Sequence, residues 1–136
     1  MASRPELSIV IPVHNEADNV EPLYAELAAS LAQMGRPAEV IFADDGSTDG
    51  TFGRLAEIHR RRAPRAGERS GDDAAPGVHV LRLRRRFGKS AALAAAFAEA
   101  RGDVVITMDG DLQDDPKEIP RFLEKLTGGC DLVSGW

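Results

Sequence analysis

Cysteine and tryptophan each occur once in the 136 residues, and no apolar run is long. Cys130 alone cannot form a disulfide or a cysteine-based zinc site within one chain, so we expect a reducing, cytoplasmic environment. The longest apolar runs, Leu7 to Ile11 and Ala91 to Ala98, are too short to span a bilayer. The first six residues also lack a signal-peptide pattern. The sequence therefore predicts a soluble chain without a disulfide framework.

A surplus of positive charge is also absent, because the formal net charge is -5. Binding to a nucleic-acid backbone depends on many Lys and Arg residues, so a general nucleic-acid binder is excluded. Charge is nevertheless concentrated in two places. The basic residues are Arg82, Arg84, Arg85, Arg86 and Lys89, and the acidic ones are Asp109, Asp111, Asp114 and Asp115. One loop that attracts anions and one that attracts cations are typical of a site for a metal-bound anionic ligand.

Segments rich in Val and Ile alternate with segments of helical periodicity, and no repeat is present. Strands are predicted at Leu7–Val13, Val40–Ala43, Val78–Leu83, Val104–Met108 and Leu132–Ser134, and helices at Asn19–Met34, Thr51–Arg61, Ser90–Ala100 and Ile119–Leu126. This alternation predicts an α/β domain over residues 1–136, with a mostly parallel sheet and helices on both faces. The first strand is apolar throughout, which favours a central position.

Ligands of such sheets bind beyond the carboxyl ends of the strands. The segments 14–18, 44–50, 84–89 and 109–115 each follow a strand, so they share that edge. The segment Ala63 to Gly77 follows a helix and belongs to the opposite edge. Its Pro, Gly, Arg and Asp residues cannot bury enough apolar area to offset ordering, so we interpret it as a flexible surface insertion.

Two carboxylates, Asp109 and Asp111, follow the fourth predicted strand and are separated by Gly110. They suit one hard divalent cation, Mg²⁺ or Mn²⁺, which leaves coordination positions for phosphate oxygens. A calcium-binding EF-hand is excluded, because Asp114 and Pro120 stand where that loop needs Gly and Glu. Taken alone, the tripeptide fits a solvent-exposed acidic turn better than a metal site, because such tripeptides are common.

The segment 43–49, Ala-Asp-Asp-Gly-Ser-Thr-Asp, lies between the second strand and the second helix. Asp45-Gly46 suits a turn, and Ser47, Thr48 or Asp49 suits a helix cap. Two adjacent acids exceed what a cap requires, and an aspartate at a strand end can accept hydrogen bonds from a base or a ribose. Both readings stay open here. Asp18 is expected to cap the first helix, while His14 has no assigned role.

The basic segment Arg84 to Ser90 leads into the third helix, where free backbone N–H groups and the helix dipole favour an anion. A P-loop is excluded, since Leu83 stands where its first glycine is needed. A dinucleotide-binding Rossmann site is excluded as well, because the segment 14–18 contains no glycine. We therefore expect a different kind of anion site at this helix.

Three ordered motifs carry a family resemblance: Ile11-Pro12-Val13-His14-Asn15-Glu16, the segment 43–49, and Met108-Asp109-Gly110-Asp111-Leu112-Gln113. Together they resemble family 2 glycosyltransferases, which have the GT-A fold. The segment 87–93 and Gln113 are similar to the branch of dolichyl-phosphate mannose synthases and undecaprenyl-phosphate sugar transferases.

The resemblance implies inverting transfer of a sugar from a UDP- or GDP-sugar to polyprenyl phosphate, with Mg²⁺ or Mn²⁺ as cofactor. It implies catalytic roles for Asp109 and Asp111. It also implies that Asp109, Asp111 and Gln113 bind the metal. The implied nucleotide contacts are Pro12, Val13, Asn15, Glu16, Asp44, Asp45, Arg86, Lys89, Asp109 and Gly110. A transferase acting on a sugar hydroxyl and a nucleotide-sugar-binding module without turnover remain alternatives.

The family's acceptor loops and any membrane helices are expected beyond Trp136. The 136-residue chain is then an incomplete, inactive donor-binding domain, and the full-length protein lies at the cytoplasmic face of a membrane.

Overall fold

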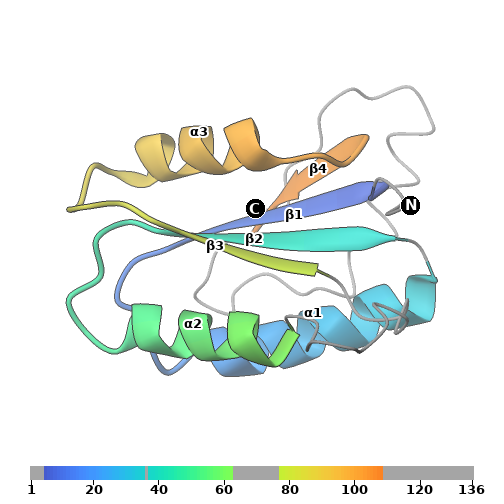
Figure 1. Ribbon diagram of the computed structural model, residues 1–136, viewed down its shortest axis with the longest axis horizontal. Helices are drawn as coiled ribbons and strands as arrows, with labels where there is room; N and C mark the ends of the chain where they lie inside the picture. Colours follow the sequence, from blue (N-terminus) through green and yellow to red (C-terminus); the bar gives the residue numbers. More distant parts are fainter. Residues whose placement is uncertain (1–4, 36, 63–76, 109–136) are drawn as a thin grey trace.

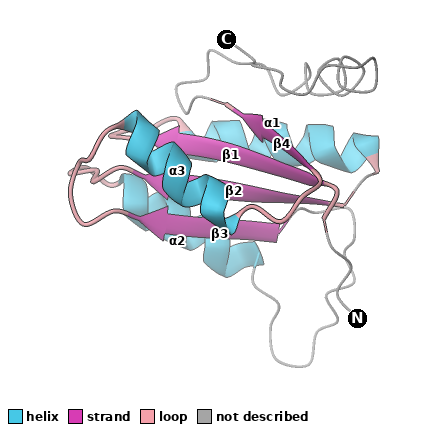
Figure 2. Ribbon diagram, turned by 90° about the horizontal axis from the view of Figure 1, so that it is seen from above, coloured by secondary structure: helices cyan, strands magenta, loops and turns pink. Residues whose placement is uncertain are grey.

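The computed structural model describes residues 5–35, 37–62 and 77–108. The elements are β1 (Leu7–Val13), α1 (Val20–Met34), β2 (Ala38–Asp44), α2 (Thr51–Arg62), β3 (Gly77–Arg82), α3 (Lys89–Glu99) and β4 (Val104–Thr107). The four strands pair in parallel in the order β3-β2-β1-β4. Helices α1 and α2 cover one face of this sheet and α3 covers the other (Figures 1 and 2). The predicted α/β layering is confirmed.

Three predicted features lie outside the described residues. They are the insertion at 63–76, the helix at 119–126 and the strand at 132–134. Gly77, the last residue of the predicted insertion, is instead the first residue of β3, paired with Glu39.

Strand β1 is the centre of the sheet, as its apolar sequence predicts. All seven of its residues are buried, and it pairs with β2 on one side and β4 on the other. Alternate side chains point to opposite faces. Ile9 and Ile11 enter the large core with Phe42 of β2, whereas Val10 packs towards α3.

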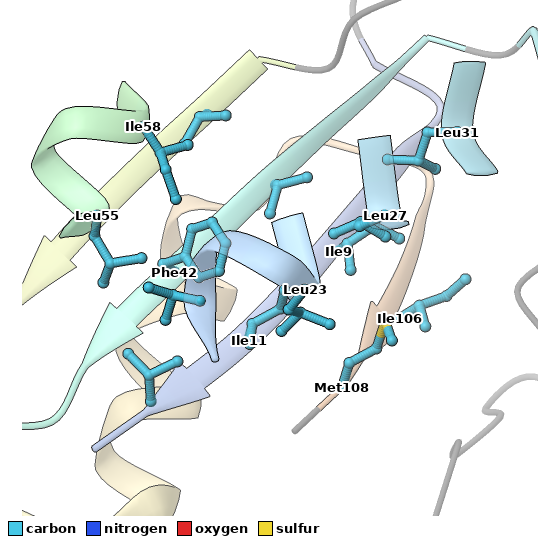
Figure 3. Close-up of a cluster of buried hydrophobic side chains, with 14 of the residues drawn as sticks. Ile9, Ile11, Leu23, Leu27, Leu31, Phe42, Leu55, Ile58, Ile106 and Met108 are labelled. Atoms are coloured by element: carbon cyan, nitrogen blue, oxygen red, sulfur yellow. The ribbon is translucent and has the colours of Figure 1, made fainter. Parts of the chain in front are cut away.

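The large core lies between the sheet and helices α1 and α2 (Figure 3). Leu23, Leu27 and Leu31 of α1 and Leu55 and Ile58 of α2 supply its helical side. These residues recur at spacings of three and four, so each helix presents one apolar stripe to the sheet.

The opposite face is covered by small side chains. Ala92 and Ala96 of α3 are fully buried and pack with Val10, Ile41 and Ala43. Alanine both favours the helix and permits a close approach to the strands. The carboxyl ends of β1 and β2 are therefore held between two helical layers.

Helix α1 ends as predicted but begins differently. Gly35 is left-handed, with φ 67°, and its N–H reaches the carbonyls of Leu31 and Ala32. At the other end Asn19, not Asp18, is the N-cap, and its N–H donates to the backbone carbonyl of Glu16 over 2.9 Å. The prediction that Asp18 caps the helix is therefore wrong.

Across the described residues, no helix combines the length and the apolar character that crossing a membrane requires.

A buried polar network closes the amino-terminal edge of the sheet, opposite the predicted site. The Glu39 carboxylate, 3% exposed, accepts the Ser8 hydroxyl over 2.6 Å and the Arg101 N–H over 2.7 Å. His79 lies 3.3 Å from the same carboxylate, and the Gly102 N–H donates to Ser8 Oγ over 2.8 Å. One side chain therefore connects β1, β2, β3 and the segment before β4.

We predict that Glu39→Ala lowers the free energy of unfolding by about 2–3 kcal/mol, because it leaves buried donors without an acceptor. Urea denaturation measures the change. The control is Glu57→Ala, since the Glu57 side chain is 45% exposed on α2, and it should stay within about 0.5 kcal/mol of the parent. Equal stability of the two variants would contradict the structural role of Glu39.

Candidate functional site

The loops after β1, β2 and β3 meet at one edge of the sheet, at the left of Figure 1. This juxtaposition follows from parallel pairing, which brings the carboxyl ends of neighbouring strands together. Val13 and Asp44, the last residues of β1 and β2, are register partners, and Asp44 is also paired with Arg82 of β3. The predicted functional edge is thus formed by these three loops.

Asn15 links the first two loops. It is the one non-glycine residue with a positive φ among the described residues, at 54°. Its N–H donates to Ser47 Oγ over 2.9 Å, and its Oδ1 accepts the N–H groups of Thr48 over 2.9 Å and Asp49 over 3.3 Å. Asparagine tolerates this left-handed conformation better than most residues, which suits it to the position.

Asp49 also links the first two loops, and it lies two residues before the start of α2. Its carboxylate accepts the Ala17 N–H over 3.4 Å and the Thr51 N–H over 2.9 Å. Of the three predicted caps Ser47, Thr48 and Asp49, Asp49 is the one whose carboxylate accepts the N–H of the first helical residue. Hydrogen bonds from the Thr51 hydroxyl and N–H hold the pKa of Asp49 below its ordinary value.

Asp44 is fully buried at the end of β2. Its Oδ1 accepts the Ser47 N–H over 2.9 Å, and its Oδ2 has no hydrogen-bond partner within the described ranges. A buried carboxylate oxygen without a donor is costly. Asp44 is therefore able to accept a further hydrogen bond.

Asp45 connects the second loop to the third. Its Oδ1 accepts the Phe87 N–H over 2.7 Å, and its Oδ2 accepts the Gly88 N–H over 3.0 Å. These two residues immediately precede α3. The sequence predicted that free N–H groups here attract an anion, and the structure shows that an internal carboxylate already binds two of them. The helix dipole favours negative charge at this position.

Gly46 brings the same two loops into direct contact. It has φ 67°, and a Cβ there would lie 2.4 Å from the Arg85 carbonyl carbon and the Arg86 nitrogen. Only glycine satisfies both the left-handed conformation and this close approach.

A pocket of about 440 Å³ opens between the loops. It is lined by His14, Gly46, Ser47, Thr48, Arg82, Leu83, Arg84, Arg85 and Arg86. Its wall is thus strongly basic, although the whole chain carries a net charge of -5. Two of the guanidinium groups lie over aromatic rings, Arg82 at 4.2 Å from the Phe52 centroid and Arg85 at 4.8 Å from that of Phe87. This environment suits an anionic ligand that has a planar or polar part.

His14, to which the sequence assigned no role, forms part of this wall. Its Nδ1 lies 2.8 Å from the Asp45 carbonyl oxygen, and its Nε2 lies 3.3 Å from Asn15 Nδ2. Its place directly after β1, at the same edge as residues 44–49, was the signal that pointed to it.

The other predicted site residues within the described ranges fall at the same edge. Pro12 and Val13 are buried at the end of β1, the Glu16 carboxylate accepts Asn19 Nδ2, and Lys89 is the first residue of α3. Asp109, Gly110, Asp111 and Gln113 lie outside the described residues. They follow β4, where the Met108 N–H donates to the Val10 carbonyl over 2.9 Å. No group of three or more His, Cys, Asp or Glu residues suited to a metal occurs in the described part of the chain.

Residues 8–136 match the family model described as Glycosyl transferase family 2. The chain belongs to this family. A related family member is the undecaprenyl-phosphate 4-deoxy-4-formamido-L-arabinose transferase of Edwardsiella ictaluri, 41% identical over 127 residues. The alignment covers 93% of this chain and 35% of that protein, so the chain spans about a third of the relative's length.

Solved structures of glycosyltransferases share the fold. The mannosyltransferase PcManGT of Pyrobaculum calidifontis, in complex with GDP-Man and Mn²⁺, is 28% identical with a TM-score of 0.57, covering 80% of this chain and 28% of that one. The glucosyl-3-phosphoglycerate synthase of Mycobacterium tuberculosis, in complex with UDP, is 25% identical with a TM-score of 0.61, covering 92% and 41%. The GT-A-like fold that the resemblance implied is confirmed.

We predict that Gly46→Ala in this family 2 glycosyltransferase lowers the free energy of unfolding by about 2 kcal/mol or more, because the new methyl group would overlap the Arg85–Arg86 backbone. Gly53→Ala is the matched control. Gly53 lies inside α2 with nothing near its added Cβ, so this change should be neutral or stabilising by up to about 1 kcal/mol. Urea denaturation of both variants decides, and equal effects would contradict the close packing of the two loops.

Proposed function

We propose that this chain is the donor-binding part of an inverting glycosyltransferase that moves a sugar from a UDP- or GDP-sugar to polyprenyl phosphate. The observation that carries the proposal is the basic pocket at the carboxyl edge, beside the buried Asp44 carboxylate with its unpartnered oxygen. A nucleoside diphosphate combines the negative charge that the arginines attract with N–H and hydroxyl donors for a carboxylate.

Asp44 is the first choice for the nucleoside contact, because its Oδ2 lacks a donor within the described ranges. Asp45 already accepts the N–H groups of Phe87 and Gly88, so its main contribution is to hold the basic loop in place. Pro12, Val13 and Glu16 shape the same end of β1 and remain proposed nucleotide neighbours.

The diphosphate needs positive charge from side chains, because two of the N–H groups before α3 are bound by Asp45. Arg86, which lines the pocket, and Lys89, at the start of α3, are the proposed groups. They would offset the negative charge that develops on the departing nucleoside diphosphate.

The proposed metal is Mg²⁺ or Mn²⁺, held by Asp109, Asp111 and Gln113. Two carboxylates and one amide carbonyl form an oxygen donor set that fits either ion. The relative PcManGT, in complex with GDP-Man and Mn²⁺, supports this choice. When bound, the ion would supply further stabilisation of the leaving diphosphate.

Polyprenyl phosphate is proposed as acceptor because the name of the relative from Edwardsiella ictaluri includes undecaprenyl phosphate. Its phosphate is already anionic, so attack on the anomeric carbon would need no strong general base. With such a lipid acceptor, the proposed site of the reaction is the cytoplasmic face of a membrane. A sugar hydroxyl is the alternative acceptor, and it would require a base.

We predict that UDP or GDP binds in the presence of Mg²⁺ or Mn²⁺ and that Asp44→Asn weakens binding by about tenfold or more, as loss of a charged hydrogen-bond acceptor implies. Isothermal titration calorimetry measures both effects. Glu26→Gln, which changes an exposed carboxylate on α1, should leave the affinity unchanged. Unaltered binding by Asp44→Asn would refute the nucleoside assignment, and equal binding in EDTA would refute the metal.

We predict that the 136-residue chain alone binds the nucleotide but forms no lipid-linked sugar above a control without protein. It spans 35% of the length of its relative, and loss of acceptor positioning removes on the order of 10⁵-fold or more of rate. Radiolabelled donor, polyprenyl phosphate and metal supply the assay, with the full-length protein as the positive control. Product formation by the short chain would refute the division between binding and turnover.

A further inference from the structure

Every polar group of the Asn15 side chain, together with its backbone N–H, is bound within the protein. The N–H donates to Ser47 Oγ over 2.9 Å, and Oδ1 accepts the N–H groups of Thr48 and Asp49. Nδ2 lies 3.3 Å from His14 Nε2. The family resemblance implied that Asn15 contacts the nucleotide, but these hydrogen bonds leave its side chain little capacity for a ligand.

The partners of Asn15, in contrast, face the pocket. His14, Ser47 and Thr48 line it, and Asn15 does not. Its amide group therefore bridges two parts of the wall, the ring of His14 and the turn at Ser47–Thr48. A change at Asn15 reaches the pocket through these neighbours.

The His14 ring is bound at both nitrogens. The Asp45 carbonyl, 2.8 Å from Nδ1, can only accept a hydrogen bond, so Nδ1 carries the proton. Nε2 then accepts a hydrogen bond from Asn15 Nδ2. The Asp45 carbonyl thus selects the tautomer, and the hydrogen bond from Asn15 Nδ2 to Nε2 helps to hold the ring in one orientation.

We infer that Asn15 is a positioning residue, which orders the Ser47–Thr48 side of the pocket and the orientation of the His14 ring without itself touching the nucleotide-sugar. This inference rests on the proposed function for its effect on nucleotide affinity. Its structural part, the state of the ligand-free pocket, is independent of that function.

Two substitutions separate the two contacts of the side chain. Asn15→Gly keeps the left-handed backbone but removes both Oδ1 and Nδ2. Asn15→Asp keeps an oxygen for the Thr48 and Asp49 N–H groups and tolerates the same φ, but it removes the donor to His14. Asn19→Ala is the matched control, because Asn19 lies in the same loop and donates to Glu16, away from Ser47 and Thr48.

Amide hydrogen exchange and NMR of the His14 ring nitrogens test the inference in the ligand-free protein. We expect Asn15→Gly to speed exchange of the Thr48 and Asp49 amides by about tenfold or more, since each loses its acceptor. It should also shift the His14 Nε2 signal, since that nitrogen loses its hydrogen-bond donor. Asn15→Asp should retain amide protection while changing the His14 signals. Asn19→Ala should change neither readout.

Nucleotide titration supplies the second arm. If only about a tenth of the Asn15→Gly molecules have an ordered pocket, the apparent affinity for UDP or GDP falls about tenfold. Asn15→Asp should retain most of the parent's nucleotide affinity. A loss of affinity with unchanged exchange and unchanged His14 ring signals would overturn the inference and make Asn15 a direct ligand. If the parent chain binds no nucleotide, the proposed function fails, while the exchange and NMR results still decide the positioning role.

Discussion

Parallel pairing of a fully buried β1 is the constraint on which the rest of the structure depends. All seven of its residues are buried, and it pairs with β2 and β4 in one direction. The loops that follow the parallel strands must therefore leave the sheet at one edge, crowded between α3 on one face and α1 and α2 on the other (Figure 2). Their backbone N–H groups need partners that the strands no longer provide. Short polar side chains in the neighbouring loops supply them: Asn15 for the N–H groups of Thr48 and Asp49, and Asp45 for those of Phe87 and Gly88.

Because the loops hydrogen-bond to one another, a carboxylate of the protein itself already occupies part of the anion-binding position before α3. The Asp45 carboxylate is held by the N–H groups of Phe87 and Gly88, which directly follow three arginines in the sequence. Arg84, Arg85 and Arg86 line the pocket beside it. A fixed internal carboxylate also lowers the net positive charge of this loop, so the arginines can be close together with less mutual repulsion. The positive charge that the proposed anionic ligand needs is therefore concentrated on guanidinium groups. A guanidinium group can bind phosphate through two N–H donors at once.

The sequence was sufficient for the elements, because their periodicity is strong. Each described helix and strand was predicted within about two residues at either end, and the apolar run of β1 predicted its central place. Strand β2 was predicted two residues too short at its start, because the charged Glu39 interrupts the apolar run in the sequence. Its burial depends on donors from Ser8 and Arg101, which lie far away along the chain.

The edge of the sheet that carries the site was predictable from strand order, but the hydrogen bonds between its loops were not. Asp18 was expected to cap α1, whereas Asn19 is the N-cap and the Glu16 carbonyl accepts the N–H groups of Asn19 and Val20.

The motif residues at this edge therefore divide by what their polar atoms are bound to. Asn15 and Asp45 use their side-chain oxygens within the protein, so they act on a ligand through the loops that they hold. Asp44 retains a buried oxygen without a donor in the described residues, which lowers stability unless a further group, such as a ligand, approaches it. A stable protein tolerates such a cost only where it is offset, and binding sites are the usual place. The two adjacent aspartates thus differ: Asp45 holds the basic loop through its hydrogen bonds, and Asp44, the proposed nucleoside contact, keeps one oxygen without a donor in the described residues.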